Sequence, residues 1–87
     1  MKIEFHNNFI KNYNKRFGKN IKIKDRFIER TKIFQSDPTN PLLKDHQLKG
    51  KRAAYRAFSV TGDIRVVYLF INNIIYFFDI GSHNQVY

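Results

Sequence analysis

The apolar residues of this chain change their spacing once, and that change constrains the fold more than any other feature of the sequence. Up to about Gln35 they recur every three or four residues, as in helices packed on a core. Beyond Gly50 they alternate, as in strands. Between the two parts lie residues 37–41, Asp-Pro-Thr-Asn-Pro, whose prolines lack amide donors and restrict the residues before them. The pattern predicts an α+β fold, with helices first and an antiparallel meander after them.

The first part of the chain predicts a short strand at residues 2–5 and then a helix. Asn7 or Asn8 can cap this helix, and Gly18 can end it in a left-handed conformation. Aromatic residues at i, i+4 and i+8 give the helix one apolar stripe: Phe9, Tyr13 and Phe17. Packing of this stripe should fix the helix on the sheet.

A second helix is expected from a cap at Asn20 to about Gln35. Its inward side chains are expected to be Ile23, Phe27, Ile28, Thr31 and Phe34. A short turn separates the two helices, which predicts an antiparallel helical hairpin. The segment 42–48, which carries His46, is expected to be a loop.

Three strands are expected in the second part, at residues 54–60, 63–70 and 74–80. Thr61-Gly62-Asp63 is expected to join the first two, and Asn72-Asn73 the last two, since Asn tolerates the positive φ of a tight hairpin turn. The predicted order is therefore β-α-α-β-β-β, an N-terminal helical hairpin on a small, mainly antiparallel sheet. A chain of 87 residues is expected to form a single domain over residues 1–87.

Charge is the first indication of function. The chain has 16 Lys and Arg against 7 Asp and Glu, a net charge of +9, and this excess lies entirely in residues 1–52. Such a distribution favours a polyanionic partner, with simple solvation of two helices as the alternative. The chain has no cysteine and no apolar run near the ~20 residues that cross a bilayer, so we expect a soluble, cytoplasmic protein with no membrane partner.

A few polar residues fit poorly in a purely structural domain. Asp63 and Arg65 fall on one face of a predicted strand, where an ordinary exposed ion pair is the alternative interpretation. His46 and His83 flank the sheet, and histidine can both take and give a proton near neutral pH. His6, beside the first helix cap, is interpreted as a surface residue.

These residue types match what RNA cleavage without a metal requires. A base must help the 2′-hydroxyl attack the adjacent phosphorus, a cation must balance the phosphoryl charge, and an acid must protonate the leaving 5′-oxygen. His46 or Asp63 could be the base, Arg65 the cation and His83 the acid. No metal and no cofactor are predicted, because the histidines and Asp63 lack tight ligand spacing.

Two further residues have open roles. Arg56 could be a second cation if its face turns toward the site, with packing or solvation as the alternative. Tyr87 could stack on a base or touch the phosphate, and docking on the core is the alternative.

Several segments together resemble one known family. They are residues 43–50 (LKDHQLKG), 55–56 (YR), 63–68 (DIRVVY) and the tail from Gly81-Ser82-His83 to Tyr87. Their order and spacing resemble the YafQ branch of the RelE/ParE toxin superfamily, and the resemblance covers essentially the whole chain. It implies a type II toxin–antitoxin toxin that cleaves messenger RNA in the ribosomal A site, with a cognate antitoxin protein as partner.

The resemblance also implies roles for individual residues. The family's histidine loop, strand aspartate, tail histidine and C-terminal aromatic match His46, Asp63, His83 and Tyr87, and Arg65 matches the arginine that RelE-type toxins use at the scissile phosphate. Contacts with RNA phosphates are expected from the lysine-rich helices and from a basic set that comprises Lys44, Lys49, Lys51, Arg52 and Arg56. This chain departs from better-known YafQ-like sequences at Ser59, where they carry a histidine, and at Ile64, where they carry a tryptophan.

Two other functions are compatible with the same sequence. One is a ParE-like DNA gyrase inhibitor that acts by binding, since one fold can host unrelated activities. The other is a non-catalytic protein that binds RNA or ribosomes, for which Ser59 in place of a histidine is the supporting feature.

Overall fold

One five-stranded sheet organises the structure, a computed structural model that describes residues 1–87. Along the chain the elements are β1 (Lys2–Phe5), α1 (Asn7–Arg16), α2 (Ile21–Ser36), the 3₁₀ helix η1 (Pro41–Leu43), β2 (His46–Gln47), the 3₁₀ helix η2 (Gly50–Arg52), β3 (Arg56–Ser59), β4 (Ile64–Ile71), β5 (Ile74–Ser82) and α3 (His83–Val86). None of these helices has the length and hydropathy needed to span a bilayer.

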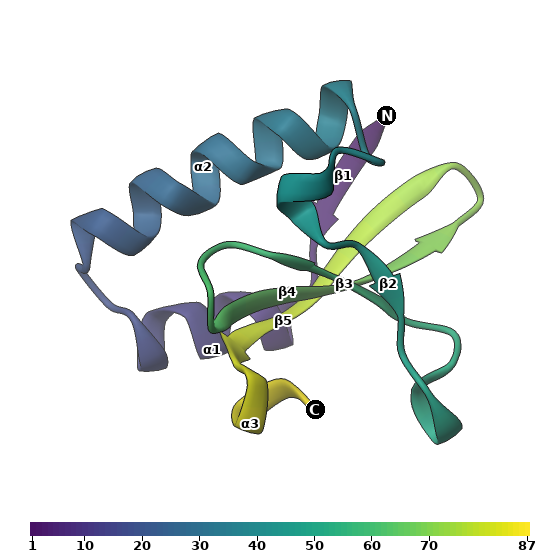
Figure 1. Cartoon of the computed structure of the whole chain (residues 1–87). Coiled ribbons are helices and arrows are strands. Elements are labelled where there is room, and N and C mark those ends of the chain that lie inside the picture. Colours follow the sequence, from purple (N-terminus) through teal and green to yellow (C-terminus); the bar gives the residue numbers. More distant parts are fainter.

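The strands lie in the order β1-β5-β4-β3-β2, and only the β1–β5 pair is parallel. The first and the last strand of the chain, β1 and β5, therefore lie side by side in the sheet (Figure 1). The β4–β5 hairpin turns at Asn72 and Asn73, whose φ angles of 52° and 64° match the two left-handed positions of a tight hairpin turn. The predicted α+β class, the antiparallel meander of β3, β4 and β5 and the hairpin turn are confirmed.

The face of the sheet that α1 and α2 cover holds the larger core. Phe34 stacks on Phe58 at 4.9 Å between ring centroids, and Phe77 is fully buried among the surrounding rings. Ten buried residues form this core: Phe9, Phe34, Leu43, Phe58, Val60, Val66, Tyr68, Ile75, Phe77 and Ile80. The aromatic stripe of α1 is confirmed, since Phe9 belongs to this core and the other two rings pack against it. The two helices run in opposite directions and diverge from the turn between them (Figure 1).

The opposite face has a much smaller core of four buried residues: Leu48, Ala57, Val67 and Val86. Consecutive strand residues point to opposite faces, so Ala57 and Val67 lie here while Phe58 and Val66 lie in the larger core. The cover on this side is short. It consists of α3, which Figure 1 shows at the lower end of the molecule, and of the segment after β2 that contributes Leu48.

The start of α1 differs from the prediction. His6 is the cap, because its Nδ1 accepts a hydrogen bond from the amide of Asn8 at 3.0 Å. The predicted cap at Asn7 or Asn8 was therefore wrong, whereas the exposure of His6 agrees with its interpretation as a surface residue. In α2 the predicted cap is confirmed, with Asn20 accepting from the amide of Ile23 at 3.2 Å. Ile28 was expected to face inward but is 40% exposed.

The segment after the prolines is also more ordered than predicted. Residues 42–48 are not a simple loop, since β2 adds a fifth strand through pairing of His46 with Ala57 and of Gln47 with Arg56. The next strand begins at Arg56 and not at residue 54. A two-residue strand carries no periodicity of its own, so it forms only because β3 offers a partner.

Candidate functional site

The two predicted histidines meet at Tyr87 on the face with the smaller core. His46 comes from β2, His83 is the first residue of α3, and Tyr87 follows the end of α3. The Tyr87 ring lies edge-on to both imidazoles, with centroid distances of 5.9 Å to His46 and 4.5 Å to His83. All three line one hollow of about 490 Å³, and both imidazoles are exposed.

Two hydrogen bonds fix the proton arrangement of neutral His46. Its Nδ1 lies 3.0 Å from the carbonyl oxygen of Lys44. A carbonyl can only accept, so Nδ1 carries the proton and Nε2 keeps its lone pair. That lone pair accepts from the Tyr87 hydroxyl at 3.3 Å. His46 therefore presents a proton acceptor to the hollow.

Hydrogen bonds and one buried side chain hold helix α3 in place, and this keeps Tyr87 in the hollow. Gln85 closes a capping box by accepting from the amide of Ser82 at 2.8 Å, and the buried side chain of Val86 packs on the sheet. Arg52 donates to the Val86 carbonyl. Burial raises the pKa of Tyr87 above its usual 10.0, and the nearby Arg65 charge only partly opposes this. The phenol is thus a neutral donor at neutral pH.

Arg65 adjoins the site but is held by its own neighbours. It lies opposite Ser59 in the β3–β4 register and donates to the Ser59 hydroxyl and to the carbonyl oxygen of Gly62, the latter at 3.4 Å. Its Nε is buried without an acceptor. No ion pair joins Arg65 to Asp63, so the interpretation of these residues as a surface ion pair was wrong.

Asp63 lies in the predicted turn before β4, where the Thr61 hydroxyl accepts from the amides of Asp63 and Ile64. Its carboxylate accepts from the backbone amide of His83 at 3.3 Å. Asp63 thus connects the turn to the start of α3. This position suits the orientation of His83 better than removal of a proton from a substrate.

Comparisons with known proteins identify the family of the chain. The profile of the family described as the bacterial toxin of type II toxin-antitoxin system, YafQ, matches residues 1–87. The chain belongs to the YafQ toxin family. It is therefore the toxin of a type II toxin–antitoxin system. A comparison with curated protein sequences gives no match.

Solved structures place this YafQ-family toxin in the RelE/ParE-like fold. A copper-bound mutant toxin from Helicobacter pylori is 25% identical, with a TM-score of 0.76 over 100% of this chain and 99% of that one. A YoeB/ParE toxin from Agrobacterium tumefaciens is 19% identical, with a TM-score of 0.78 over 95% and 99%. The toxin of the E. coli DinJ–YafQ toxin–antitoxin complex is 22% identical, with a TM-score of 0.71 over 99% and 96%.

The basic residues that were predicted to bind RNA fall into two groups in the YafQ-family toxin. Lys49 and Arg52 line the hollow that contains the histidines, and Lys51 is exposed on the same short helix, η2. Lys44 and Arg56 instead line a neighbouring hollow together with Asp45. No group of three or more His, Cys, Asp or Glu side chains is placed to hold a metal ion.

A three-residue network beside His46 was missed by sequence reasoning. The Asp45 carboxylate accepts from Arg56 Nε at 2.7 Å and from the Tyr68 hydroxyl. Burial first, and the hydrogen bond to Asp45 second, raise the pKa of Tyr68 above its usual range, and the bond to Asp45 raises that of Arg56. The available signal was Asp45 itself, the one acidic residue between Pro38 and Gly62.

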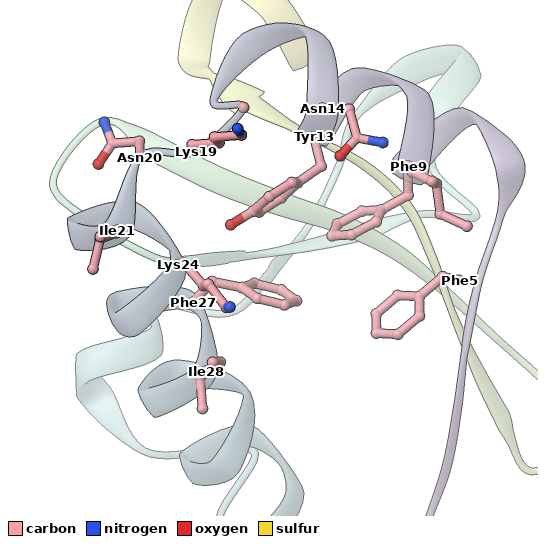
Figure 2. A pocket seen from close by; sticks show the side chains of 12 residues that line it. Phe5, Phe9, Tyr13, Asn14, Lys19, Asn20, Ile21, Lys24, Phe27 and Ile28 are labelled. Atoms are coloured by element: carbon pink, nitrogen blue, oxygen red, sulfur yellow. The ribbon is translucent and has the colours of Figure 1, made fainter.

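The YafQ-family toxin also has an apolar groove between α1 and α2, with a volume of about 530 Å³. Figure 2 shows the rings of Phe5, Phe9, Tyr13 and Phe27 along this groove, with Ile21 and Ile28 on the side of α2. Lys19 and Lys24 also line it. Four large apolar residues of the groove are exposed, Ile21 most of all at 70%. The groove belongs to the helical layer, whereas the histidines lie on the opposite face of the sheet.

Proposed function

We propose that this toxin is an endoribonuclease that cleaves messenger RNA on the ribosome by acid–base chemistry. The observation that carries the proposal is the arrangement of two exposed imidazoles around Tyr87, one of which turns its lone pair to the Tyr87 hydroxyl. A protein that acts by binding alone does not need two proton carriers beside one phenol. The proposed steps use only side chains of this chain.

His46 is the proposed base. Its Nε2 removes the proton from a 2′-hydroxyl, whose oxygen then attacks the adjacent phosphorus. The hydrogen bond from Nδ1 to the Lys44 carbonyl stabilises the imidazolium that forms, because the carbonyl dipole points at the new charge. In the free protein the Tyr87 hydroxyl occupies the position that the substrate hydroxyl would take.

His83 is the proposed acid. As the bond between phosphorus and the 5′-oxygen breaks, protonated His83 gives its proton to that oxygen, which leaves a 2′,3′-cyclic phosphate and a free 5′-hydroxyl. Asp63 orients His83 through its backbone amide. Arg65 and the neutral phenol of Tyr87 lower the energy of the charge on the phosphoryl oxygens, which requires Arg65 to exchange its Gly62 contact for the phosphate.

The basic side chains around the hollow are proposed to hold the RNA backbone. Lys49 and Arg52 line the hollow of the histidines, where phosphates on either side of the scissile bond would pass, and Lys51 is exposed on the adjacent η2. Lys44 and Arg56 extend this positive surface toward the neighbouring hollow. Such contacts do not depend on the RNA sequence, which suits a messenger RNA bound on the ribosome.

The test replaces each of the three histidines by asparagine. We expect the His46→Asn and His83→Asn variants to lose cleavage by about 10²- to 10⁴-fold, since each removes one proton carrier. His6→Asn is the matched control, because asparagine preserves the cap of α1. The measurement is primer extension on a message translated by purified ribosomes, supported by mapping of new 5′ ends in cells.

Cleavage at the wild-type rate by both site variants would reject the proposed chemistry. A parallel assay of supercoiling by purified gyrase distinguishes the nuclease from a ParE-like gyrase inhibitor. Inhibition of gyrase together with intact message would assign the toxin to a ParE-like mode of action. Binding to ribosomes without any cut would assign it to the non-catalytic mode.

We further propose that an acidic, amphipathic segment of the cognate antitoxin occupies the groove between α1 and α2. The groove offers exposed apolar side chains and lysines, and residues 7–36 hold nine basic and two acidic side chains. This charge disfavours a second copy of the chain and favours an acidic partner. The relative from E. coli was solved as a toxin–antitoxin complex, which supports a protein partner of this kind.

Substitutions in the groove test this partner. Ile21→Gln and Lys24→Glu should each weaken binding of the co-expressed antitoxin at least about 10-fold, measured by titration calorimetry. Cleavage by the free Ile21→Gln toxin should not change. Ile71→Gln is the control, since Ile71 is also exposed but lies at the β4–β5 turn. Equal losses in the control and the groove variants would contradict the assignment.

A further inference from the structure

His46 depends on a backbone conformation that its own strand cannot secure. The carbonyl that fixes its tautomer belongs to Lys44, whose φ of 47° is left-handed, a conformation that costs energy in any residue with a side chain. Strand β2 has only two residues, so its ladder offers little support. The Lys44 and His46 side chains are both exposed.

The residue between them supplies the missing support. The Asp45 side chain is 10% exposed, and its two oxygens each accept from a different donor, Arg56 Nε at 2.7 Å and the Tyr68 hydroxyl. A buried carboxylate is tolerated only with such partners. Both donors come from one place on the sheet, because Arg56 and Tyr68 are directly opposite in the β3–β4 register.

Tyr68 ties this network to the larger core. Its ring is 4% exposed and packs edge-on against Phe34 at 4.9 Å. Side chains alternate between faces along a strand, so the network lies on the helical face, while His46, opposite Ala57, points to the other face. Anchoring Asp45 on one face therefore fixes the backbone on both sides of it, including the Lys44 carbonyl that holds the His46 ring.

We propose that Asp45, held by Arg56 and Tyr68, is a positioning residue that sets the tautomer and orientation of His46. The inference rests on the proposed function, since it assigns a role to the network through the proposed base. It also revises the role of Arg56. The Nε of this side chain donates to Asp45, so Arg56 acts on the site from the helical face of the sheet. Its contribution to phosphate binding is secondary.

The test observes His46 directly and does not depend on activity. In ¹⁵N NMR spectra of the full chain, neutral His46 should be protonated at Nδ1 in the wild type. Asp45→Ala and Tyr68→Phe should both shift the ring toward the Nε2-protonated form, and Asp45→Asn should retain more of the original tautomer because its amide oxygen still accepts from Arg56. Asp25→Ala, which changes an exposed acid on α2, is the matched control.

Kinetics provide the second readout. Asp45→Ala should lower kcat for message cleavage by about 10- to 100-fold with KM within about three-fold, because a misplaced base slows chemistry and leaves binding intact. Tyr68→Phe keeps the buried ring, so it decides the question if Asp45→Ala fails to fold. An unchanged His46 tautomer in the folded variants would overturn the inference. Absence of cleavage by the wild type would reject the nuclease proposal, yet the tautomer measurement would still stand.

Discussion

The two faces of the sheet differ in what their residues contribute. The helical face buries ten residues in one network of aromatic and aliphatic side chains, whereas the opposite face buries four small or aliphatic residues and exposes two histidines and a tyrosine. Apolar burial is the main source of folding free energy, so most stability should come from the first face. The second face can hold polar groups that a core would not accept. One face therefore supplies most of the stability, and the other carries the candidate functional residues.

The largest expected effect is on the helical face. Phe77→Ala should lower the free energy of unfolding by about 3–5 kcal/mol, because Phe77 is fully buried and its ring lies beside those of Phe9, Phe34 and Phe58. Urea denaturation measures the loss. Phe70→Ala on the adjacent strand is the control, since Phe70 is 57% exposed and should cost less than about 1 kcal/mol. Equal losses in the two variants would remove the distinction between core and surface.

A smaller effect is expected where the two faces meet, at Gly81. A Cβ built there would lie 2.7 Å from Arg16 Nη1, 2.8 Å from Gln85 Oε1 and 3.0 Å from Gln85 Cβ. Both polar groups are already bonded, Arg16 to Asp79 and the Ile80 carbonyl and Gln85 to the Ser82 amide.

Gly81→Ala should therefore lower the free energy of unfolding by about 1–3 kcal/mol and also loosen α3. Thermal denaturation measures the first effect, and hydrogen exchange at Tyr87 measures the second. If the variant is as stable as the wild type and α3 is equally protected from hydrogen exchange, the Arg16 and Gln85 side chains move away from the new methyl group at little energetic cost.

The smallest effect concerns Tyr68 at alkaline pH. Its pKa is raised above the usual 10.0 in the folded state, so the folded protein holds this proton more tightly than the unfolded chain. The stabilisation is complete below about pH 10 and is lost as the pH rises through the higher folded pKa.

Between pH 9.5 and 11 the wild type should therefore lose about 1 kcal/mol more than Tyr68→Phe, measured by urea denaturation at each pH. Tyr13 and Tyr87 also have raised pKa values, but both are present in the two proteins, so their contributions cancel. If the unfolding free energies of the wild type and Tyr68→Phe change with pH in parallel, the Tyr68 hydroxyl is solvated in the folded protein.

The sequence predicted the parts of the fold that depend on local pattern. The aromatic stripe of α1, the Asn20 cap and the Asn72-Asn73 turn each follow from residue type and spacing. β2 was not predictable, because two residues become a strand only when β3 is beside them. The same limit applies to Ile28. Its position in the helical pattern of apolar residues indicates a buried side chain, but Ile28 lines an open groove.

For the site, the sequence indicated which residue types to expect but not their geometry. His46 in β2 meets His83 and Tyr87 at the C-terminal helix, two segments that are far apart in the sequence, which residue spacing alone cannot reveal. Asp63 and Arg65 are two residues apart, yet one contacts the start of α3 and the other contacts Ser59. Their separation arises because Asp63 lies in the turn before the strand, where alternation no longer applies. Roles for these residues stay predictions until the variants are measured.

The pairing of β1 with β5 bears on the order in which the parts of this toxin fold. Residues 2–5 find their strand partner only in residues 74–77, and the rings of the earlier segments share a common neighbour only once Phe77 exists. Contacts between such distant parts of a chain form late in folding. Assembly of the sheet, and with it of the face that carries His46 and His83, should therefore be a late step in the folding of this toxin.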